Sequence, residues 1–558
     1  MGRISWKMVF YARFLLTASV FFTGVGRCTI LHAQAGDERP NIIYLFSDEH
    51  RYQSMSFTET AAVKTPNMEQ LASEGAYFRN AISNNPLCSP HRSMLLSGRW
   101  SYSTGMVENN GTLAPWDRTL GNVFKEAGYN TGYTGKWHAG KYPQLAGFDW
   151  HMHWLETNEH WNSTWTDLHG TGATTRCTTY NATKMTDQAL EFIDSFAVES
   201  SPFFLIVSWN PPHYVFTDAP EDKISLYPSS VELPWRANAA EESKEKWWDD
   251  YQGYHAHITA IDEEIGRIMD KLEDLGITGN TILIYSADHG SMMNSHGKGN
   301  KRHPDEESIR VPFLVRYPGG IEAGQVKEEL FGSIDIFPTL CGLAGIDAPE
   351  FCDGQDFSPL LFGKEGPDPE SQFLMHIGRK GVTGDLHNYH TPFFRGVRSK
   401  RYTYTVNPNG PWQLFDNQTD PYQENNLIND PSLSAVREEL RAELDRWIEI
   451  AEDPDLHPDY VAMPLEERIY RQAVFHNGSS QLKEFASRLR LSPEQETRLV
   501  NMRYCTYDEN GRPRGADSSK DWKEADRTLR KKIREMLTPD QLQKFEELEA
   551  LEKSALGN

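Results

Sequence analysis

Short apolar runs alternate with longer amphipathic stretches after the first 40 residues of the chain. Three of these runs have strand length and are almost continuously apolar: 41–47 (NIIYLFS), 202–208 (PFFLIVS) and 281–286 (TILIYS). Such runs are typical of parallel strands that are buried on both faces. Residues 119–127 and 254–275, which lie between the runs, have the spacing of amphipathic helices. The alternation predicts an α/β fold with a large mixed, mostly parallel sheet covered by helices on both faces.

The alternation of apolar runs and amphipathic stretches changes toward the C-terminus. Residues 366–385 are rich in Gly and Pro, which indicates a boundary, and 394–398 and 401–406 then resemble strands of a smaller antiparallel sheet. Residues 433–451 have the period of a long amphipathic helix. The expected parts of the chain are a signal peptide at 1–35, a catalytic domain at 36–365, a smaller subdomain at 366–460 and a helical extension at 461–558.

The C-terminal extension is charged, helical in period and poor in strand formers. Ser492-Pro-Glu-Gln495 and Thr538-Pro-Asp-Gln541 each place a hydroxyl residue at the N-cap, Pro at N1 and Gln at N3, which is a helix-start signal. Both starts follow a leucine, and in this they resemble the Leu-Thr-Pro-x-Gln repeats of small periplasmic helical proteins. We expect a structural cap or an interaction surface here rather than a catalytic role.

The N-terminus predicts export. Arg3, Lys7 and Arg13 flank the start of an apolar run at 14–26, and Ala33-Gln34-Ala35 offers a small-x-small cleavage site. The run is shorter than the ~20 residues that span a bilayer, and no later segment is apolar enough to do so. We therefore expect a soluble periplasmic or extracellular protein without a stable membrane span; an uncleaved anchor is the alternative.

The net charge of −23 bears on partners. It argues against nucleic acid, because binding to phosphates needs a basic surface. A site for any anionic substrate must therefore create its own positive field from a metal and a few Lys, Arg or His residues. The six cysteines have no CxxC spacing, so neither a zinc site nor a disulfide scaffold is predicted. Cys341 and Cys352 could form one disulfide in an oxidising compartment.

Acids and imidazoles follow the three predicted strands, and a fourth segment, 131–138, adds an amine and an imidazole. Ligands of open α/β sheets bind beyond the carboxyl ends of the strands, so we expect these residues at one edge. Each alone has an ordinary structural interpretation, such as a helix cap for a strand-terminal Asp, but four coincidences favour a site. The residues are Asp48, Glu49 and His50 in the first segment, Lys136 and His138 in the second, His213 in the third, and Asp288 and His289 in the fourth.

The carboxylates of this set predict a metal site. Asp48, Glu49 and Asp288 offer hard oxygen ligands, which suit Ca²⁺ or Mg²⁺ better than zinc. A single imidazole among them does not change that preference. Arg92, the lysines and the histidines would supply the positive field for an anionic substrate.

The segment Cys88-Ser-Pro-His-Arg-Ser-Met-Leu-Leu-Ser-Gly-Arg99 resembles the Cys-x-Pro-x-Arg signature, followed by Leu-x-Gly-Arg, of the type I sulfatases. Other segments resemble this family in the same order along the chain: 65–72 (TPNMEQLA), 135–138 (GKWH), 306–312 (EESIRVP) and 412–421 (WQLFDNQTDP). The resemblance covers roughly residues 41–451. It implies an alkaline-phosphatase-like fold and a sulfuric ester hydrolase.

The resemblance also implies a nucleophile and its helpers. A formylglycine-generating enzyme would convert Cys88 to formylglycine, whose hydrate attacks sulfur and forms a covalent sulfate ester. His213 or Lys301 would protonate the leaving alcohol, and His138 would remove the proton that expels sulfate. Arg92 and Lys136 would hold the diol and the sulfate oxygens. One divalent cation, favoured as Ca²⁺ with Mg²⁺ as the alternative, would bind Asp48, Glu49, Asp288, His289 and residue 88.

The chain departs from the family pattern at two positions, of which the first concerns Glu49 as a metal ligand and the second the substrate. The chain has Asp48-Glu49 where many members have Asp-Asp, and Asp288-His289 where the best-known members have Asp-Asn. Asp-His also occurs in phosphonate and phosphate ester hydrolases of the superfamily, which are one alternative function. A non-catalytic secreted binding protein is another. We favour sulfated saccharides over other sulfated small molecules, with four tryptophans either stacking on sugar rings or packing in the core: Trp150, Trp154, Trp161 and Trp165.

Overall fold

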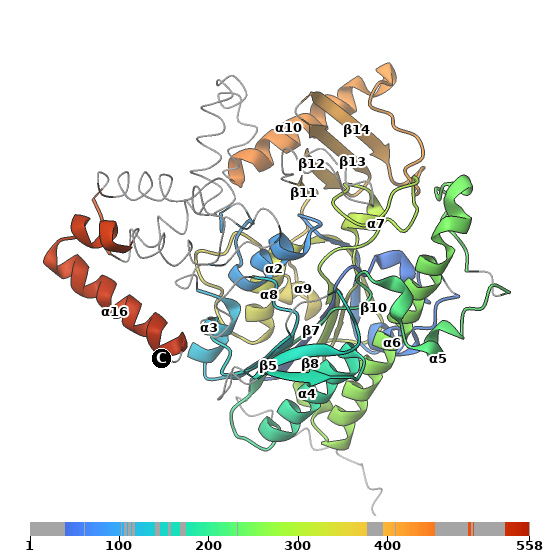
Figure 1. The fold of residues 1–558 in the computed structure, drawn as a ribbon. Coiled ribbons are helices and arrows are strands. Elements are labelled where there is room, and N and C mark those ends of the chain that lie inside the picture. Colours follow the sequence, from blue (N-terminus) through green and yellow to red (C-terminus); the bar gives the residue numbers. More distant parts are fainter. Residues whose placement is uncertain are drawn as a thin grey trace, which may run out of the picture. The chain divides into compact units, whose positions relative to one another are not determined.

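A computed structural model describes most of the chain between residues 39 and 451 and short parts beyond it (Figure 1). The described residues run from 39 to 451, except 61, 102, 105, 107–108, 110–112, 114–117, 140–145, 155–157, 168–173, 231–232, 377–393 and 408, and then comprise 489–492, 495 and 530–556. The predicted signal peptide, Cys28, Cys505 and most of the C-terminal extension lie outside these residues.

A mixed sheet of ten strands forms the centre of the larger domain, in the order β10-β2-β9-β8-β1-β7-β3-β4-β5-β6. Its strands are β1 Asn41–Ser47, β2 Ala76–Ile82, β3 Asn130–Gly135, β4 Trp150–Trp154, β5 Ser163–Asp167, β6 Thr174–Cys177, β7 Phe203–Trp209, β8 Thr281–Ala287, β9 Phe313–Arg316 and β10 Gln325–Gly332. The central strands β8, β1, β7 and β3 are mutually parallel neighbours. The four strands that precede the predicted site residues are therefore adjacent, and their carboxyl ends lie at one edge of the sheet, where the sequence predicted these residues to meet.

The alternation of side chains along the central strands divides the core into two layers. Ile43 and Leu45 of β1 face one layer, where they join buried residues of the helices α1, α4 and α6. Ile42 and Tyr44 face the other layer, with buried residues of α2, α3 and α8. Because both faces are covered, β1, β7 and β8 are apolar along most of their length rather than alternating. Figure 1 shows these helices flanking the sheet.

The helices of the described part have these bounds: α1 Pro66–Ser73, α2 Cys88–Ser97, α3 Leu120–Glu126, α4 Asn181–Phe196, α5 Glu221–Ile224, α6 Lys244–Asp274, α7 Glu306–Ile309, α8 Ile336–Leu343, α9 Ser358–Leu361, α10 Ser434–Ile450 and α16 Pro539–Leu556. Short 3₁₀ turns include η1 Tyr52–Ser54 and η3 Phe216–Asp218. Helix α6 starts ten residues earlier than the sequence predicted. Its first turns are fixed by packing, since Tyr251 stacks on Trp235 with ring centroids 3.9 Å apart.

The smaller sheet is antiparallel, in the order β11-β12-β13-β14 (orange in Figure 1). Its strands are β11 Ser371–His376, β12 Phe394–Ser399, β13 Tyr402–Asn407 and β14 Gly410–Asp416. Strand β11 lies inside the Gly- and Pro-rich stretch that we interpreted as a boundary, so that stretch already belongs in part to the smaller sheet. Met94 of α2 packs in one buried cluster with Phe373 and Leu444 of this region. The helix that begins at Cys88 is thus braced by the smaller sheet.

The described part of the C-terminal extension contains both predicted helix starts. Ser492 N donates to Gln495 Oε1 at 2.9 Å and Gln495 N donates to Ser492 Oγ at 3.2 Å, which is a capping box. Thr538 N likewise donates to Gln541 Oε1 at 2.9 Å, and α16 begins at the next residue. The amide of Gln495 also donates to Gln541 Oε1 at 2.9 Å, so the two starts bind each other.

Other predictions concern single residues. Trp165 is buried in the core, and Trp150 and Trp161 pack partly against the same core, so these three serve packing; the side chain of Trp154 lies outside the described residues. Cys341 and Cys352 are free thiols rather than a disulfide. Across the described residues, each helix is too short or too polar to cross a membrane.

Candidate active site

Cys88 is the first residue of helix α2, and its side chain is 1% exposed. The helix ends at Gly98, which adopts the left-handed conformation (φ 65°) and donates its N–H to Met94 O at 2.8 Å. The N-terminus of a helix carries partial positive charge from its unpaired N–H groups. Position 88 is therefore suited to a negatively charged nucleophile.

The acidic residues reach Cys88 from the carboxyl ends of β1 and β8. Cys88 Sγ lies 3.6 Å from Asp48 Oδ1 and 3.3 Å from His289 Nε2. His289 Nε2 lies 3.6 Å from Asp48 Oδ1 and 3.4 Å from Asp288 Oδ1. His289 Nδ1 lies 2.9 Å from Gly290 O, which can only accept, so Nδ1 carries a proton and Nε2 faces the carboxylates. Four ligand atoms from three segments thus converge on one point.

Three cations surround these carboxylates. Arg92 Nη2 lies 3.1 Å from both Asp48 Oδ2 and Asp288 Oδ2. Lys136 Nζ lies 2.8 Å from Asp48 Oδ2, and Lys301 Nζ lies 3.8 Å from Asp48 Oδ1. All three side chains are at least 95% buried. The positive field that the acidic sequence required is therefore built inside the protein.

The pKa values follow from burial and these charges. Burial would raise the pKa of Asp48, but Lys136, His213, Lys301 and Arg92 outweigh it and hold that pKa well below its ordinary value. Burial and the charge of Asp48 raise the pKa of Asp288. Burial also opposes ionisation of Cys88, yet nearby cations, with Lys301 the largest, bring the pKa of that thiol well below its usual range. Negative charge at position 88 is thus stabilised by the site.

Glu49 faces the lysine rather than the four-atom cluster. Its Oε2 lies 3.1 Å from Lys301 Nζ and 3.9 Å from His213 Nε2. The backbone of Glu49 is left-handed (φ 75°), and its N–H donates to Asp288 Oδ1 at 3.1 Å. Asp48 therefore binds Arg92 and Lys136, whereas Lys301 lies nearer to Glu49 than to Asp48, at 3.1 against 3.8 Å.

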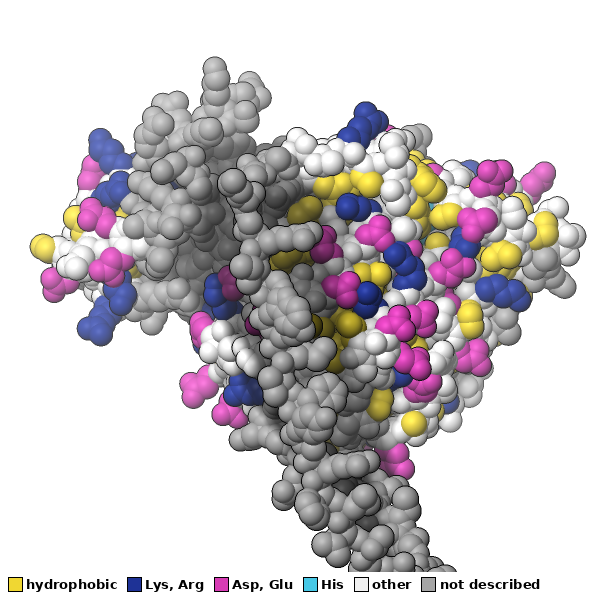
Figure 2. All heavy atoms as spheres, turned by 90° about the horizontal axis from the view of Figure 1, so that it is seen from below, with side chains coloured by type: hydrophobic (Ala, Val, Ile, Leu, Met, Phe, Trp, Pro, Cys, Tyr) yellow, Lys and Arg dark blue, Asp and Glu magenta, His cyan; other side chains and the backbone are white. Residues whose placement is uncertain are grey.

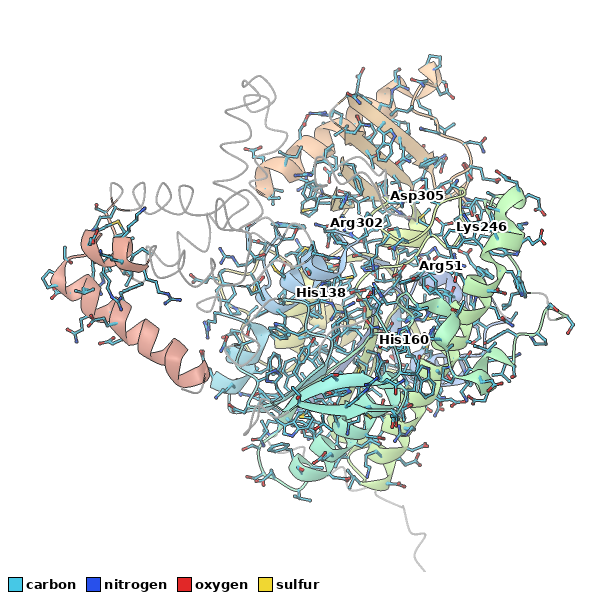
Figure 3. The ribbon with its side chains drawn as sticks, viewed as in Figure 1. Arg51, His138, His160, Lys246, Arg302 and Asp305 are labelled. Carbon is cyan, nitrogen blue, oxygen red and sulfur yellow. The ribbon has the colours of Figure 1, made fainter. Side chains whose placement is uncertain are left out.

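The backbone of His138 lies beside Ser89, the residue after Cys88. Its carbonyl accepts a hydrogen bond from Ser89 Oγ at 2.7 Å, and its backbone is left-handed (φ 45°). Its side chain is half-buried; His138 is labelled in Figure 3. His50, by contrast, turns away from the site, with Nδ1 2.6 Å from Tyr285 Oη and Nε2 3.2 Å from Ser54 O.

Three residues that the sequence analysis did not identify support the site: Ser208, Asn210 and Tyr254. Arg92 Nη1 donates to Ser208 Oγ at 2.7 Å, and Lys136 Nζ donates to Asn210 Oδ1 at 3.3 Å. Tyr254 Oη donates to Glu49 O at 2.8 Å and accepts from Arg51 N at 3.0 Å. Asn210 directly follows β7, so the strand-end rule could have found it, whereas the sequence gives no signal for Tyr254.

The donor set fits one divalent hard cation. Asp48, Cys88, Asp288 and His289 each offer one ligand atom, and these atoms all lie within 4.8 Å of one another. Glu49 Oε1 is buried and accepts no hydrogen bond from the described residues. The two carboxylate oxygens of this set suit Ca²⁺ or Mg²⁺.

The exterior carries no comparable concentration of positive charge on the face drawn in Figure 2. Acidic and basic side chains are interspersed there over the described residues. On this face the described residues offer an anionic group no attraction comparable to that of the buried cations of the site, where charges are poorly screened.

The comparisons with known proteins agree with this geometry. Residues 40–346 match the family described as "Sulfatase", and residues 294–449 match "N-sulphoglucosamine sulphohydrolase, C-terminal". An "Ulvan-active sulfatase" of Formosa agariphila is 33% identical over 435 residues, covering 76% of this chain and 83% of the relative. An "Endo-4-O-sulfatase" of Bacteroides thetaiotaomicron is 30% identical over 490 residues, covering 75% of this chain and 93% of the relative.

Solved structures share the fold. One, titled "Metabolism of multiple glycosaminoglycans by Bacteroides thetaiotaomicron is orchestrated by a versatile core genetic locus", has a TM-score of 0.68 and 29% identity, over 77% of this chain and 99% of that chain. The family match alone spans more than half of the 558 residues. The chain therefore belongs to the sulfatase family, with the alkaline-phosphatase-like fold, and is a sulfuric ester hydrolase.

Proposed function

We propose that this chain is an exported sulfatase that removes sulfate from saccharides, using formylglycine at position 88 and one divalent cation, with Ca²⁺ favoured. The observation that carries the proposal is the position of Cys88. It starts helix α2, lies 3.6 Å from Asp48 Oδ1 and 3.3 Å from His289 Nε2, and is held among the buried cations Arg92, Lys136 and Lys301. This is the arrangement that an anionic nucleophile and a sulfate group both need.

The chain's own residues divide the work. Arg92 contacts Asp48 and Asp288 together, which offsets part of the repulsion between two buried carboxylates. Lys136 and Lys301 bind the sulfate oxygens as charge develops on them. When bound, the cation supplies Lewis acidity next to residue 88. The aldehyde supplies a hydrate with two hydroxyl groups, so that the sulfate it accepts can be eliminated after His138 removes a proton.

His213 is the donor that we assign to the leaving alcohol. Its side chain is 14% exposed, against 5% for Lys301, so it is the more accessible of the two to the departing part of the substrate. Lys301 is engaged by Glu49 Oε2 at 3.1 Å and is the better placed to bind the sulfate group. His213 Nδ1 donates to Tyr214 O at 2.8 Å, which leaves Nε2 to face the site.

Saccharides are the favoured substrates because of the relatives' names. One relative is named for activity on ulvan and another as an endo-4-O-sulfatase, and a structural neighbour's title refers to glycosaminoglycans. A phosphonate or phosphate ester hydrolase remains the second candidate, favoured by the pair Asp288-His289. Export and maturation by a formylglycine-generating enzyme complete the proposal.

The test is a substrate panel with enzyme co-expressed with a formylglycine-generating enzyme. Sulfate release would be measured from sulfated oligosaccharides of defined linkage, and in parallel from an aryl sulfate and an aryl phosphonate. We expect release from at least one oligosaccharide at a higher kcat/KM than from the aryl sulfate, and none from a Cys88→Ala control. A higher kcat/KM for the aryl phosphonate than for every sulfate would favour the second candidate. If Cys88→Ala keeps the wild-type activity, the assignment of residue 88 as the nucleophile is wrong.

A further inference from the structure

A second cluster of polar side chains lies next to the loop that carries His213. Asp218 Oδ1 lies 2.6 Å from His160 Nδ1 and 3.4 Å from His257 Nε2. His257 Nδ1 lies 2.6 Å from Tyr180 Oη, and the rings of His160 and His257 have centroids 4.4 Å apart. We call these four residues the histidine–aspartate cluster; His160 is labelled in Figure 3. The two histidines are fully buried, and the side chain of Asp218 is 28% exposed.

The protons in this cluster can be assigned from its acceptors. Val215 O lies 3.2 Å from His257 Nε2, and a carbonyl can only accept, so Nε2 carries a proton. Nδ1 is then the acceptor for the hydroxyl of Tyr180. His160 Nδ1 faces the carboxylate at 2.6 Å and donates to it. Burial would raise the pKa of Asp218, but the hydrogen bonds from His160 and His257 bring it below its ordinary value, so the carboxylate accepts from both rings.

The spacing favours protons over a metal in this cluster, although His160, Asp218 and His257 are ligand types for one. Two ligands of a tetrahedral zinc ion lie about 3.4 Å apart, given bonds of about 2.1 Å. The 2.6 Å between His160 Nδ1 and Asp218 Oδ1 is a hydrogen-bond distance. The ligand atoms at Cys88 are instead 3.3 to 3.6 Å apart.

The cluster holds the loop 211–218 at several points. His257 Nε2 donates to Val215 O at 3.2 Å, and Trp161 Nε1 donates to Asp218 O at 2.7 Å. Helix α6 also meets the loop backbone directly, because a Cβ added at Gly253 would lie 2.1 Å from Phe216 O. The only side chain that fits there is hydrogen, which explains a glycine inside a long helix despite its low helix propensity.

The face of α6 that carries His257 also carries Tyr254, which binds the segment of Glu49 on the other side of the site. Tyr254, three residues before His257, donates to Glu49 O at 2.8 Å and accepts from Arg51 N at 3.0 Å. Residues three apart lie on one face of a helix. One rigid helix therefore fixes both the segment of Glu49 and the loop of His213, whose Nε2 and Glu49 Oε2 are 3.9 Å apart.

We propose that His257, Asp218 and His160 are positioning residues that hold His213 at the leaving oxygen. The proposal rests on the proposed function, since it assumes His213 as proton donor. It predicts a distinct kinetic signature. A displaced proton donor slows the expulsion of a basic alkoxide, whereas a nitrophenolate leaves without a proton. A general loss of folding would slow all substrates alike.

The experiment compares His257→Phe, His257→Gln and Asp218→Asn with wild type on aryl sulfates of graded leaving-group pKa. For His257→Phe we expect a loss of kcat at least about tenfold larger with the poorest leaving group than with 4-nitrophenyl sulfate. His257→Gln should recover most of that difference, because its amide N–H can still donate to Val215 O. For Asp218→Asn we expect a difference between poor and good leaving groups that is smaller than in His257→Phe and larger than in His257→Gln. An equal loss on all substrates would overturn the proposal.

Two controls separate this proposal from the one it rests on. Asp262→Asn changes a buried carboxylate of the same helix that binds Asn67 and Met68 rather than the loop, and it should keep the wild-type dependence on leaving group. His213→Ala should show the steepest dependence; if its dependence equals that of wild type, the role of His213 is wrong. If the His257 and Asp218 variants keep the wild-type dependence on leaving group while His213→Ala does not, the positioning proposal is wrong and the role of His213 stands. Elemental analysis should find no metal lost from His257→Phe, and loss of one zinc would overturn the metal-free assignment.

Discussion

Lys301 Nζ and Glu49 Oε2 lie 3.1 Å apart, and both side chains are almost fully buried. Asp48, the residue before Glu49, instead faces Arg92 and Lys136 at 3.1 and 2.8 Å. The two adjacent acids at the end of β1 therefore have separate tasks. Asp48 belongs to the cluster of candidate ligands around Cys88, and Glu49 holds Lys301, which we propose to bind the sulfate group.

This division predicts the effect of Glu49→Gln. The variant should retain its metal, because the four-atom cluster does not include Glu49. Its kcat/KM should fall by about tenfold to 100-fold, since a buried charge-assisted hydrogen bond is worth about 1.5–3 kcal/mol. Elemental analysis together with kinetics checks both expectations. Loss of the metal in Glu49→Gln would show that Glu49 is a ligand.

Asp48→Asn and Asp288→Asn should both lose the divalent cation and nearly all turnover. Each removes a carboxylate from the set that converges on Cys88. Asp335→Asn is the matched control, because Asp335 is also a buried carboxylate but accepts from Gly332 N and Gln355 N at 2.8 Å, away from these ligands. Elemental analysis of all three proteins checks the assignment, and stoichiometric zinc without calcium or magnesium in wild type would contradict it.

The two sheets are joined by a buried ion pair between Arg398 of β12 and Glu306 of α7. Arg398 Nε lies 2.6 Å from Glu306 Oε1, and both side chains are 4% exposed. Arg398→Ala should lower the free energy of unfolding by about 3–5 kcal/mol, because it leaves Glu306 charged and buried. Thermal unfolding measures this effect, with the exposed Arg446→Ala as control. Equal midpoints for the two variants would show that the pair does not hold the sheets together.

Asp262 predicts a pH-dependent contribution to stability. Burial raises the pKa of Asp262 to about 6, although the N–H groups of Met68 and Asn67 lower it. The folded protein therefore binds a proton here more tightly than the unfolded chain, whose value is 3.8. Stability from this group is present below the unfolded value and is lost as the pH rises through about 6.

Asp262→Asn should remove that dependence. Relative to wild type, the variant should gain about 2 kcal/mol of unfolding free energy between about pH 4 and pH 7. Denaturant midpoints of both proteins over this range provide the measurement. A difference between them that does not vary with pH would mean that Asp262 titrates as it does in the unfolded chain.

Much of the fold could be predicted from the sequence because its signals are local. The runs at 41–47, 202–208 and 281–286 are continuous in apolar residues, and they became β1, β7 and β8, parallel and adjacent. The start of α6 at Lys244 was not predictable, since stacking of Tyr251 on Trp235 extends it. That contact joins segments whose proximity only the folded chain creates.

The part of the site that could be predicted from the sequence consists of residues that follow the ends of strands. Asp48, Lys136, His213 and Asp288 each follow a central strand, so the rule for open sheets brings them together. The partners of Glu49 could not be read from the sequence, because they depend on its left-handed backbone. The histidine–aspartate cluster was equally hidden, since His160, Tyr180, Asp218 and His257 come from four separate segments.

The most direct test of the account is the mass of the peptide that contains residue 88, taken from enzyme that releases sulfate. The protein would be co-expressed with a formylglycine-generating enzyme, and the digest analysed before and after treatment with a hydrazide that traps aldehydes. The account predicts that residue 88 carries an aldehyde and that the trapped fraction follows the specific activity. An unmodified thiol at Cys88 throughout a preparation with full sulfatase activity would contradict it.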